Sequence, residues 1–295
     1  MKMSSHCVVS STASESSLWG RYFDTLPRND SMFFDEQSYI SRLQVLSPHL
    51  FSATTDIEFI ESNTGADGTS KISIKDEESL STRLENVRNP AFKIMQVSRN
   101  LVLSQPLQAT SRVNPDHRSL IQPFSRKPLN VSESCTSKIF IHHNIPPGFL
   151  DILCGFGEKE ASAEDGAASG VYSSFNEFSH DIFYQFWYVE KNNRKHGDPW
   201  STRQTGIYHR FSTCHANRAE NLWVFVHPMP DSKAQKRLAV VTKDLTANDM
   251  AVNPLRLHVL VMSCYIDNWR WYLHDIKRQY TAYVGLRDDF PINRS

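Results

Sequence analysis

The chain has 295 residues, 40% of them hydrophobic and 11% aromatic, which is enough for one large domain or two small ones with a sizeable core. Its 32 Lys and Arg residues balance 32 Asp and Glu residues, so no overall field draws the protein to nucleic acid or to an anionic membrane surface. The five cysteines are scattered without a CxxC pair, which is typical of reduced thiols in the cytosol.

Both ends of the chain are expected to lie outside one central domain. Residues 1 to 34 begin with a Ser-rich stretch and are predicted to be disordered or loosely docked, with Trp19 and Tyr22 able to pack on the body. The start contains no apolar run of signal-peptide length. Residues 35 to 290 are predicted to form a single α/β domain, and residues 291 to 295 a tail.

The first half of this domain alternates between helix and strand signals. Asp35 can cap a helix that stops near Pro48. Residues 104 to 128 contain prolines and show no period, so they are predicted to be an irregular connection. Between these two segments the patterns predict two strands, a helix and a third strand, at 57 to 60, 72 to 74, 76 to 87 and 92 to 97.

Two short helices and a loop are expected next. Asn130 or Ser132 can start the first helix. The second begins at a Pro-Pro pair and can end at Gly157. The acidic and small residues from 158 to 170 predict a mobile loop.

The chain is organised around residues 181 to 211. Ile182 to Val189 has the length of a strand and is apolar on both alternating faces, which predicts a strand in the middle of a sheet. Gln204 to Phe211 is predicted to return beside it, and Leu222 to Val226 to form a third neighbouring strand. The polar stretch from 229 to 249 is assigned no helix or strand.

The last segment shows the clearest periodicity. Its spacing in steps of four and three predicts a helix with a sustained apolar seam, formed by Leu255, Val259, Met262, Ile266, Trp269, Leu273, Ile276 and Tyr280. The first half of this helix is apolar all round and is expected to be buried. The second half of this helix should show its charged residues to solvent, namely Asp267, Arg270, His274, Lys277 and Arg278. The combined pattern predicts an α/β (α+β) fold, with a mixed, largely antiparallel sheet flanked by helices.

Three ordered motifs resemble those of one family. The stretch from Tyr188 to Tyr208 reads YVEKNNRKHGDPWSTRQTGIY, and IPPGFLDILCGFGEKE precedes it at 145 to 160. The third motif is the Asn-Trp-Arg sequence that starts at Asn268. Together they resemble the fungal CorA-like transporter domain proteins over roughly residues 90 to 290.

The resemblance implies a cytosolic α/β domain similar to that of CorA-type magnesium channels, in which a stalk helix leads to two membrane helices joined by a Gly-Met-Asn motif. This sequence has no Gly-Met-Asn and no apolar run of the roughly 20 residues that a spanning helix needs. We therefore expect a cytoplasmic domain that has no pore of its own, does not insert directly into a membrane, and ends near the start of the stalk.

The family signature supplies the candidate site residues. We interpret them as structural, because Asp-Pro starts turns, Trp200 can anchor the hairpin, and Arg203 can pair with Asp198 or another carboxylate. The alternative is a ligand or subunit contact made by Arg203, Gln204 and Tyr208. The full set is Asp198, Pro199, Trp200, Arg203, Gln204, Thr205, Tyr208, Asn268, Trp269 and Arg270.

No catalytic residue, metal site or cofactor is expected. The sequence has no P-loop, dinucleotide fingerprint or nucleophile motif. Asp288 and Asp289 could hold Mg²⁺ weakly, although a charged helix end is the simpler interpretation. Four residues that might suggest zinc lack its usual spacing, namely His209, Cys214, His215 and His227.

These observations favour a non-catalytic regulatory or assembly domain of a CorA-like magnesium transporter family protein. A free-standing protein-interaction module derived from that family is the open alternative. In either case we expect protein partners or self-association, and no nucleic acid.

Overall fold

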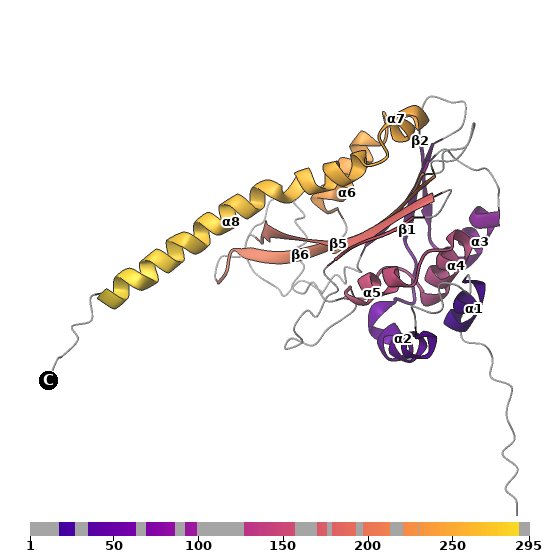
Figure 1. Ribbon diagram of the computed structural model, residues 1–295, viewed down its shortest axis with the longest axis horizontal. Coiled ribbons are helices and arrows are strands. Elements are labelled where there is room, and N and C mark those ends of the chain that lie inside the picture. The colour runs from indigo at the N-terminus through magenta and orange to yellow at the C-terminus, as the bar shows by residue number, and fades with distance from the viewer. Residues whose placement is uncertain are drawn as a thin grey trace, which may run out of the picture.

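The protein is a three-layer α/β structure with one long helix that projects from it (Figure 1). The structure is a computed structural model. It describes residues 18–26, 35–62, 69–85, 92–98, 127–156, 170–175, 179–192, 197–212, 221–229 and 231–288.

The central layer is a seven-stranded sheet in the order β2-β1-β3-β7-β6-β5-β4. Every neighbouring pair is antiparallel except β3 and β7, so the predicted mixed, largely antiparallel sheet is confirmed. The strands are β1 (Ile57–Ser62), β2 (Thr69–Ile74), β3 (Phe92–Ser98), β4 (Val171–Phe175), β5 (Ser179–Lys191), β6 (Trp200–Ser212) and β7 (Asn221–His227).

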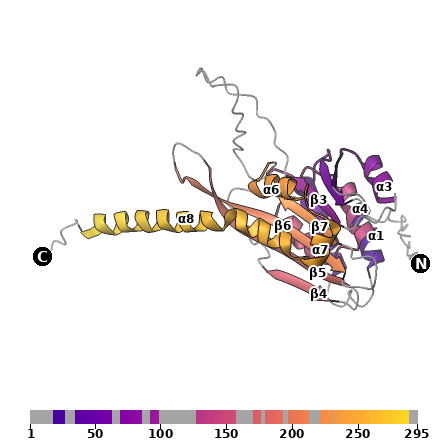
Figure 2. The same cartoon turned by 90° about the horizontal axis from the view of Figure 1, so that it is seen from above.

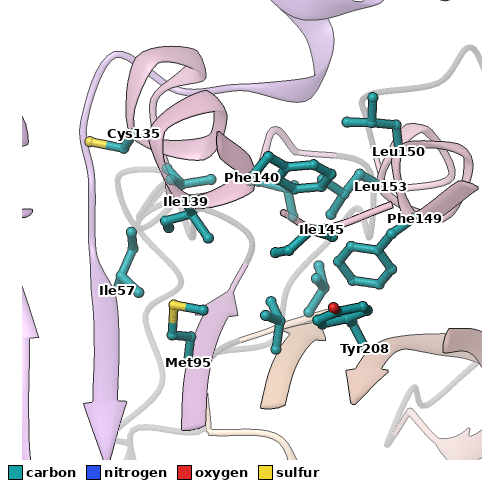
Figure 3. Close-up of a cluster of buried hydrophobic side chains, with 14 of the residues drawn as sticks. Ile57, Met95, Cys135, Ile139, Phe140, Ile145, Phe149, Leu150, Leu153 and Tyr208 are labelled. Atoms are coloured by element: carbon teal, nitrogen blue, oxygen red, sulfur yellow. The ribbon is translucent and has the colours of Figure 1, made fainter. Parts of the chain in front are cut away.

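Five helices cover one face of the sheet: α1 (Leu18–Thr25), α2 (Glu36–Leu50), α3 (Glu77–Glu85), α4 (Glu133–His143) and α5 (Gly148–Cys154). Figure 3 shows the core beneath α4 and α5, where Phe140 packs on Phe149 and Phe149 in turn packs on Tyr208 of the sheet. Helix α1 belongs to this layer, because Trp19 and Tyr22 are buried in the same cluster. The Trp19 indole donates a hydrogen bond to Glu133 Oε1 at 2.7 Å.

Three helices cover the opposite face: α6 (Lys233–Val241), α7 (Ala247–Val252) and α8 (Arg256–Asp288). Their core contains Trp223 and Phe225 of the sheet together with Leu238, Val261 and Tyr265 of the helices. Figure 2 shows α8 crossing this face, with α6 on one side of it and β4 on the other. Its second half extends beyond the sheet.

Side-chain caps explain where several helices begin. The Asp35 side chain accepts a hydrogen bond from the backbone N–H of Ser38, as predicted. Ser132, rather than Asn130, caps α4 by accepting from the N–H of Cys135. Ser232 caps α6 in the same way.

The predicted central hairpin is confirmed, but it is longer and less central than expected. Strands β5 and β6 pair from Ser179 opposite Ser212 to Lys191 opposite Trp200. Strand β5 lies next to the sheet edge rather than in its middle, since β4 pairs with its first half. Trp200 is the first residue of β6, so most of the signature lies in a strand and not in the turn.

The first half of α8 was predicted to be buried all round, and only one of its faces is. The residues that face the sheet are Leu257, His258, Val261, Cys264 and Tyr265. Seven of the eight seam residues are instead exposed, each by 40% to 68%, and only Trp269 is half-buried. The first half of α8 is apolar all round, so periodicity alone could not show which of its faces meets the sheet. The predicted exposure of the charged residues in its second half is confirmed.

Some elements were not predicted. Helices α6 and α7 lie in the polar stretch from 229 to 249 and just beyond it, and β4 follows the expected loop. Helix α5 ends at Cys154 with Gly155 as its C-cap, not at Gly157. Most of the irregular connection expected at 104 to 128 lies outside the described residues.

Candidate functional site: the β5–β6 hairpin and the root of helix α8

Trp200 joins the end of the hairpin to α8. Its indole N–H donates to Asp275 Oδ2 at 2.9 Å, and its ring meets the edge of the Tyr272 ring at 5.7 Å between centroids. Its side chain is buried, and the ammonium of Lys191 lies 5.5 Å from the ring. The contact therefore combines apolar burial with one specific polar anchor.

Asp198 and Asn192 shape the turn that leads into Trp200. Asp198 Oδ1 accepts from the backbone N–H of Trp200 at 2.9 Å, as an Asx turn does. The Asn192 side-chain amide donates to the carbonyl of Asp198 at 2.9 Å and to the carbonyl of Trp200 at 3.1 Å. The backbone N–H of Asn192 donates to the carbonyl of Pro199 at 2.9 Å. The turn therefore holds the indole towards α8.

Gln204 and the glycine two residues later connect β6 to α5. The Gln204 amide donates to the carbonyl of Gly155, and its oxygen accepts from the Gln185 amide at 2.6 Å. A Cβ added at Gly206 would lie 3.0 Å from Ile152 Cγ2. The absence of a side chain there allows α5 to approach the sheet closely.

Tyr208 is held in a buried polar network on the α5 side. Its hydroxyl donates to Asp181 Oδ1 at 2.7 Å, and Arg210 Nε donates to the same oxygen at 2.7 Å. The Arg210 guanidinium also donates to the carbonyls of His143 and Asn144. Burial raises the pKa of the Tyr208 hydroxyl well above its usual range. It therefore stays protonated and acts as a donor.

Arg203 and Thr205 lie on the opposite face, below α6 and α8. Arg203 stands opposite Tyr188 in the β5–β6 register. Burial raises the pKa of the Glu190 carboxyl, and the positive charge of Arg203 partly offsets this increase. Among the described residues Arg203 forms no ion pair within 4 Å, so the predicted pairing with Asp198 is not formed. Arg203 Nε, Thr205 Oγ1 and the Tyr188 hydroxyl are buried without a hydrogen-bond partner among the described residues.

The Asn-Trp-Arg motif lies where α8 leaves the sheet. The Asn268 side chain donates to the carbonyl of Val189 at 2.8 Å, on the part of β5 that β4 does not cover. The Trp269 ring meets the Tyr272 ring edge-on at 5.8 Å, and exposed Arg270 lies over Trp271. Asn268 and Trp200 therefore attach α8 to the hairpin at two points along its length.

Sequence reasoning missed a buried histidine network beneath the start of α8. Tyr184 Oη lies 2.8 Å from His258 Nδ1, and His258 Nε2 lies 3.1 Å from His209 Nδ1. His209 Nε2 lies 2.7 Å from Asn221 Oδ1. Desolvation lowers the pKa of His209 to about 3 and that of His258 to about 4. Only the placement of His209 on a predicted strand hinted at this network, because His258 is distant in sequence.

Of the four residues that might suggest zinc, the structure describes His209 and His227, and these two lie in separate contacts. His209 contacts His258, whereas His227 bonds Gln96 and Ser232 elsewhere in the core. Cys214, His215 and Asp289 lie outside the described residues, as does the side chain of Asp288. Within the described ranges no three His, Cys, Asp or Glu residues gather as a metal site would require.

The fold and this site define an α/β domain whose long hairpin holds a projecting helix. A family model for CorA-like transporters matches residues 17–285, which is most of the chain. The chain therefore belongs to the CorA-like transporter family. No curated protein matches it. None of the helices in the described part of the chain is both long and apolar enough to cross a membrane.

Proposed function

We propose that this chain is a non-catalytic, cytoplasmic regulatory and assembly domain of the CorA-like transporter family, without a pore of its own. Its role is to hold α8 at a defined angle and to bring α8 helices of several copies together. The observation that carries the proposal is the exposed apolar seam on a helix whose root is fixed to the sheet.

The seam has the spacing of a coiled coil. From Leu255 to Tyr283 its apolar residues alternate in steps of four and three, a period of 3.5 residues that favours packing of one helix along another. The second half of the seam lies on the part of α8 that leaves the sheet, and it consists of Ile266, Trp269, Leu273, Ile276, Tyr280 and Tyr283. Because the repeat is regular, a second copy of the same helix matches it.

The charges beside the seam favour parallel helices. Arg270 and Lys277 flank it on one side, whereas Tyr272 and Gln279 flank it on the other. In a parallel pair each flank faces the opposite flank of its partner, so the cations face uncharged residues. In an antiparallel pair the two cationic flanks would face each other, which is unfavourable. The proposed contact is therefore parallel.

Because α8 is attached to the hairpin, the sheet domain can regulate the contact between α8 helices. The bonds from Trp200 of β6 to Asp275 and from Asn268 to Val189 of β5 fix α8 relative to the hairpin. A change in the packing of the sheet domain would change the direction of α8 and hence the spacing of the helices in an assembly. Thr205, which is buried, and Arg203, which is half-buried, lie on the face of the sheet that α8 covers and support the packing where α8 is attached.

The test compares two double variants of the full chain by light scattering after size exclusion. Leu273→Asp with Ile276→Asp places charge in the seam, whereas Trp271→Asp with His274→Asp places the same charge at exposed positions off the seam. We expect the molecular mass to fall at least twofold in the seam variant only. An unchanged mass, or an equal fall in the control, would contradict the proposal.

A further inference from the structure

Strand β4 is an edge strand whose side chains are all exposed. It ends the sheet, and within the described residues no strand pairs with its outer side. Val171 and Phe175 are 73% and 69% exposed, and Tyr172 is 44% exposed. An open strand edge with apolar side chains favours pairing with another strand.

The opposite edge of the sheet is protected, and β4 is not. Strand β2 carries Lys71, whose ammonium pairs with Glu58, and Lys75 follows the strand and pairs with Asp56. Lysines on an edge strand oppose strand addition. Strand β4 has the sequence Val-Tyr-Ser-Ser-Phe, without a charge or a proline.

We infer that β4 pairs antiparallel with β4 of a second copy of this chain. The sequence matches itself when a two-fold axis passes midway between the two copies of Ser173. Val171 then faces Phe175 of the other copy, and Tyr172 faces Ser174. Because the strand is uncharged, no like charges meet at the axis.

The neighbouring surface enlarges this contact on the α8 side. Val171 and Phe175 stand opposite Tyr184 and His180 of β5, and the Tyr184 hydroxyl reaches His258 at the start of α8. That end of the helical layer also exposes Val252, Leu255 and Val259. A five-residue strand alone buries less than the roughly 800 Å² per partner of a typical stable interface, and these residues supply further apolar area.

This contact is independent of the parallel contact between α8 helices. Its two-fold axis is perpendicular to the sheet, which makes the two α8 helices antiparallel. The strand pair therefore does not use the second half of the α8 seam. Both contacts together would build a larger assembly from two different surfaces.

Cysteine cross-linking in the full chain tests the pairing. Ser173→Cys places a thiol beside the axis, next to its equivalent in the second copy. Ser73→Cys places a thiol on the exposed face of the opposite edge strand and is the matched control. Under mild oxidation we expect covalent dimers from Ser173→Cys only, and an at least tenfold lower dimer fraction when Val171→Lys is added.

A purified Ser173→Cys chain that stays monomeric on a non-reducing gel would overturn the inference, as would cross-linking equal to that of the control. A strand from a different protein as the natural occupant would give the same negative result. Repeating the measurement with Leu273→Asp and Ile276→Asp separates the two contacts. We expect the cross-link to persist there, whatever the outcome for the α8 seam.

Discussion

At the scale of single residues, the signature residues of β6 attach this strand to neighbouring parts of the structure. Trp200 reaches α8, Gln204 reaches α5 and Tyr208 reaches Asp181, so one strand holds both helical layers. This agrees with the structural interpretation of these residues, which itself stays a prediction until variants are measured.

Trp200 provides the most direct measurement at this scale. Trp200→Ala should lower the free energy of unfolding by about 3 kcal/mol, since it removes a buried indole and its bond to Asp275. Trp200→Phe keeps most of the apolar area and should cost about 1 kcal/mol. Chemical denaturation monitored by circular dichroism measures both. Unchanged stability combined with lost self-association would instead indicate a direct contact with a partner.

At the scale of elements, α8 and the sheet meet through a polar network inside an apolar core. His209 stacks on Trp223 with ring centroids 3.6 Å apart, and His258 connects the pair to the helix. His227 is also fully buried, and desolvation lowers its pKa to about 3. The packing of α8 on the sheet therefore depends on neutral imidazoles.

These pKa shifts predict a stability loss in acid. The unfolded chain takes up protons on its histidines below a pKa of about 6.5, whereas His209, His227 and His258 stay neutral in the folded chain until about pH 3 to 4. The contribution of these three neutral histidines to the free energy of unfolding is therefore fully present above pH 6.5, and it is lost as the pH decreases towards 4. The slope is about 1.4 kcal/mol per pH unit for each histidine that titrates independently.

Urea unfolding between pH 7 and pH 4 measures this slope. His227→Gln should reduce it, because one buried imidazole no longer has to stay neutral. His274→Gln, at a side chain that is 67% exposed, is the control for replacing a histidine outside the core. A slope that is the same in all three proteins would show that other groups cause the acid sensitivity.

At the scale of the whole molecule, the helical layer below the sheet begins with α1. The Tyr22 hydroxyl donates to the carbonyl of Ile145, and Trp19 packs on Phe51 and Phe140. The hydrogen bonds from Trp19 to Glu133 and from Tyr22 to Ile145 link α1 to a segment more than 100 residues away. Helix α1 is thus part of the structural body.

Deleting residues 1 to 26 should therefore destabilise the whole domain. We expect the midpoint of thermal unfolding to fall by several degrees, because the deletion removes three buried aromatic side chains, Trp19, Tyr22 and Phe23, from the core. Deleting residues 1 to 17 is the control and keeps α1 intact. Equal midpoints for the two deletions would show that α1 adds nothing to stability.

The sequence by itself determined the strands of the long hairpin, the cap of α2 and the apolar period of α8, because each depends on residues close together along the chain. Only the tertiary structure decided that the α8 seam faces solvent. Leu257, Val261 and Tyr265 form a second apolar face on the same helix, and the sheet covers that one. The bond from Trp200 to Asp275 and the contact of His209 with His258 join residues 75 and 49 positions apart. Such pairs depend on how the layers pack, and a period within one segment carries no information about that packing.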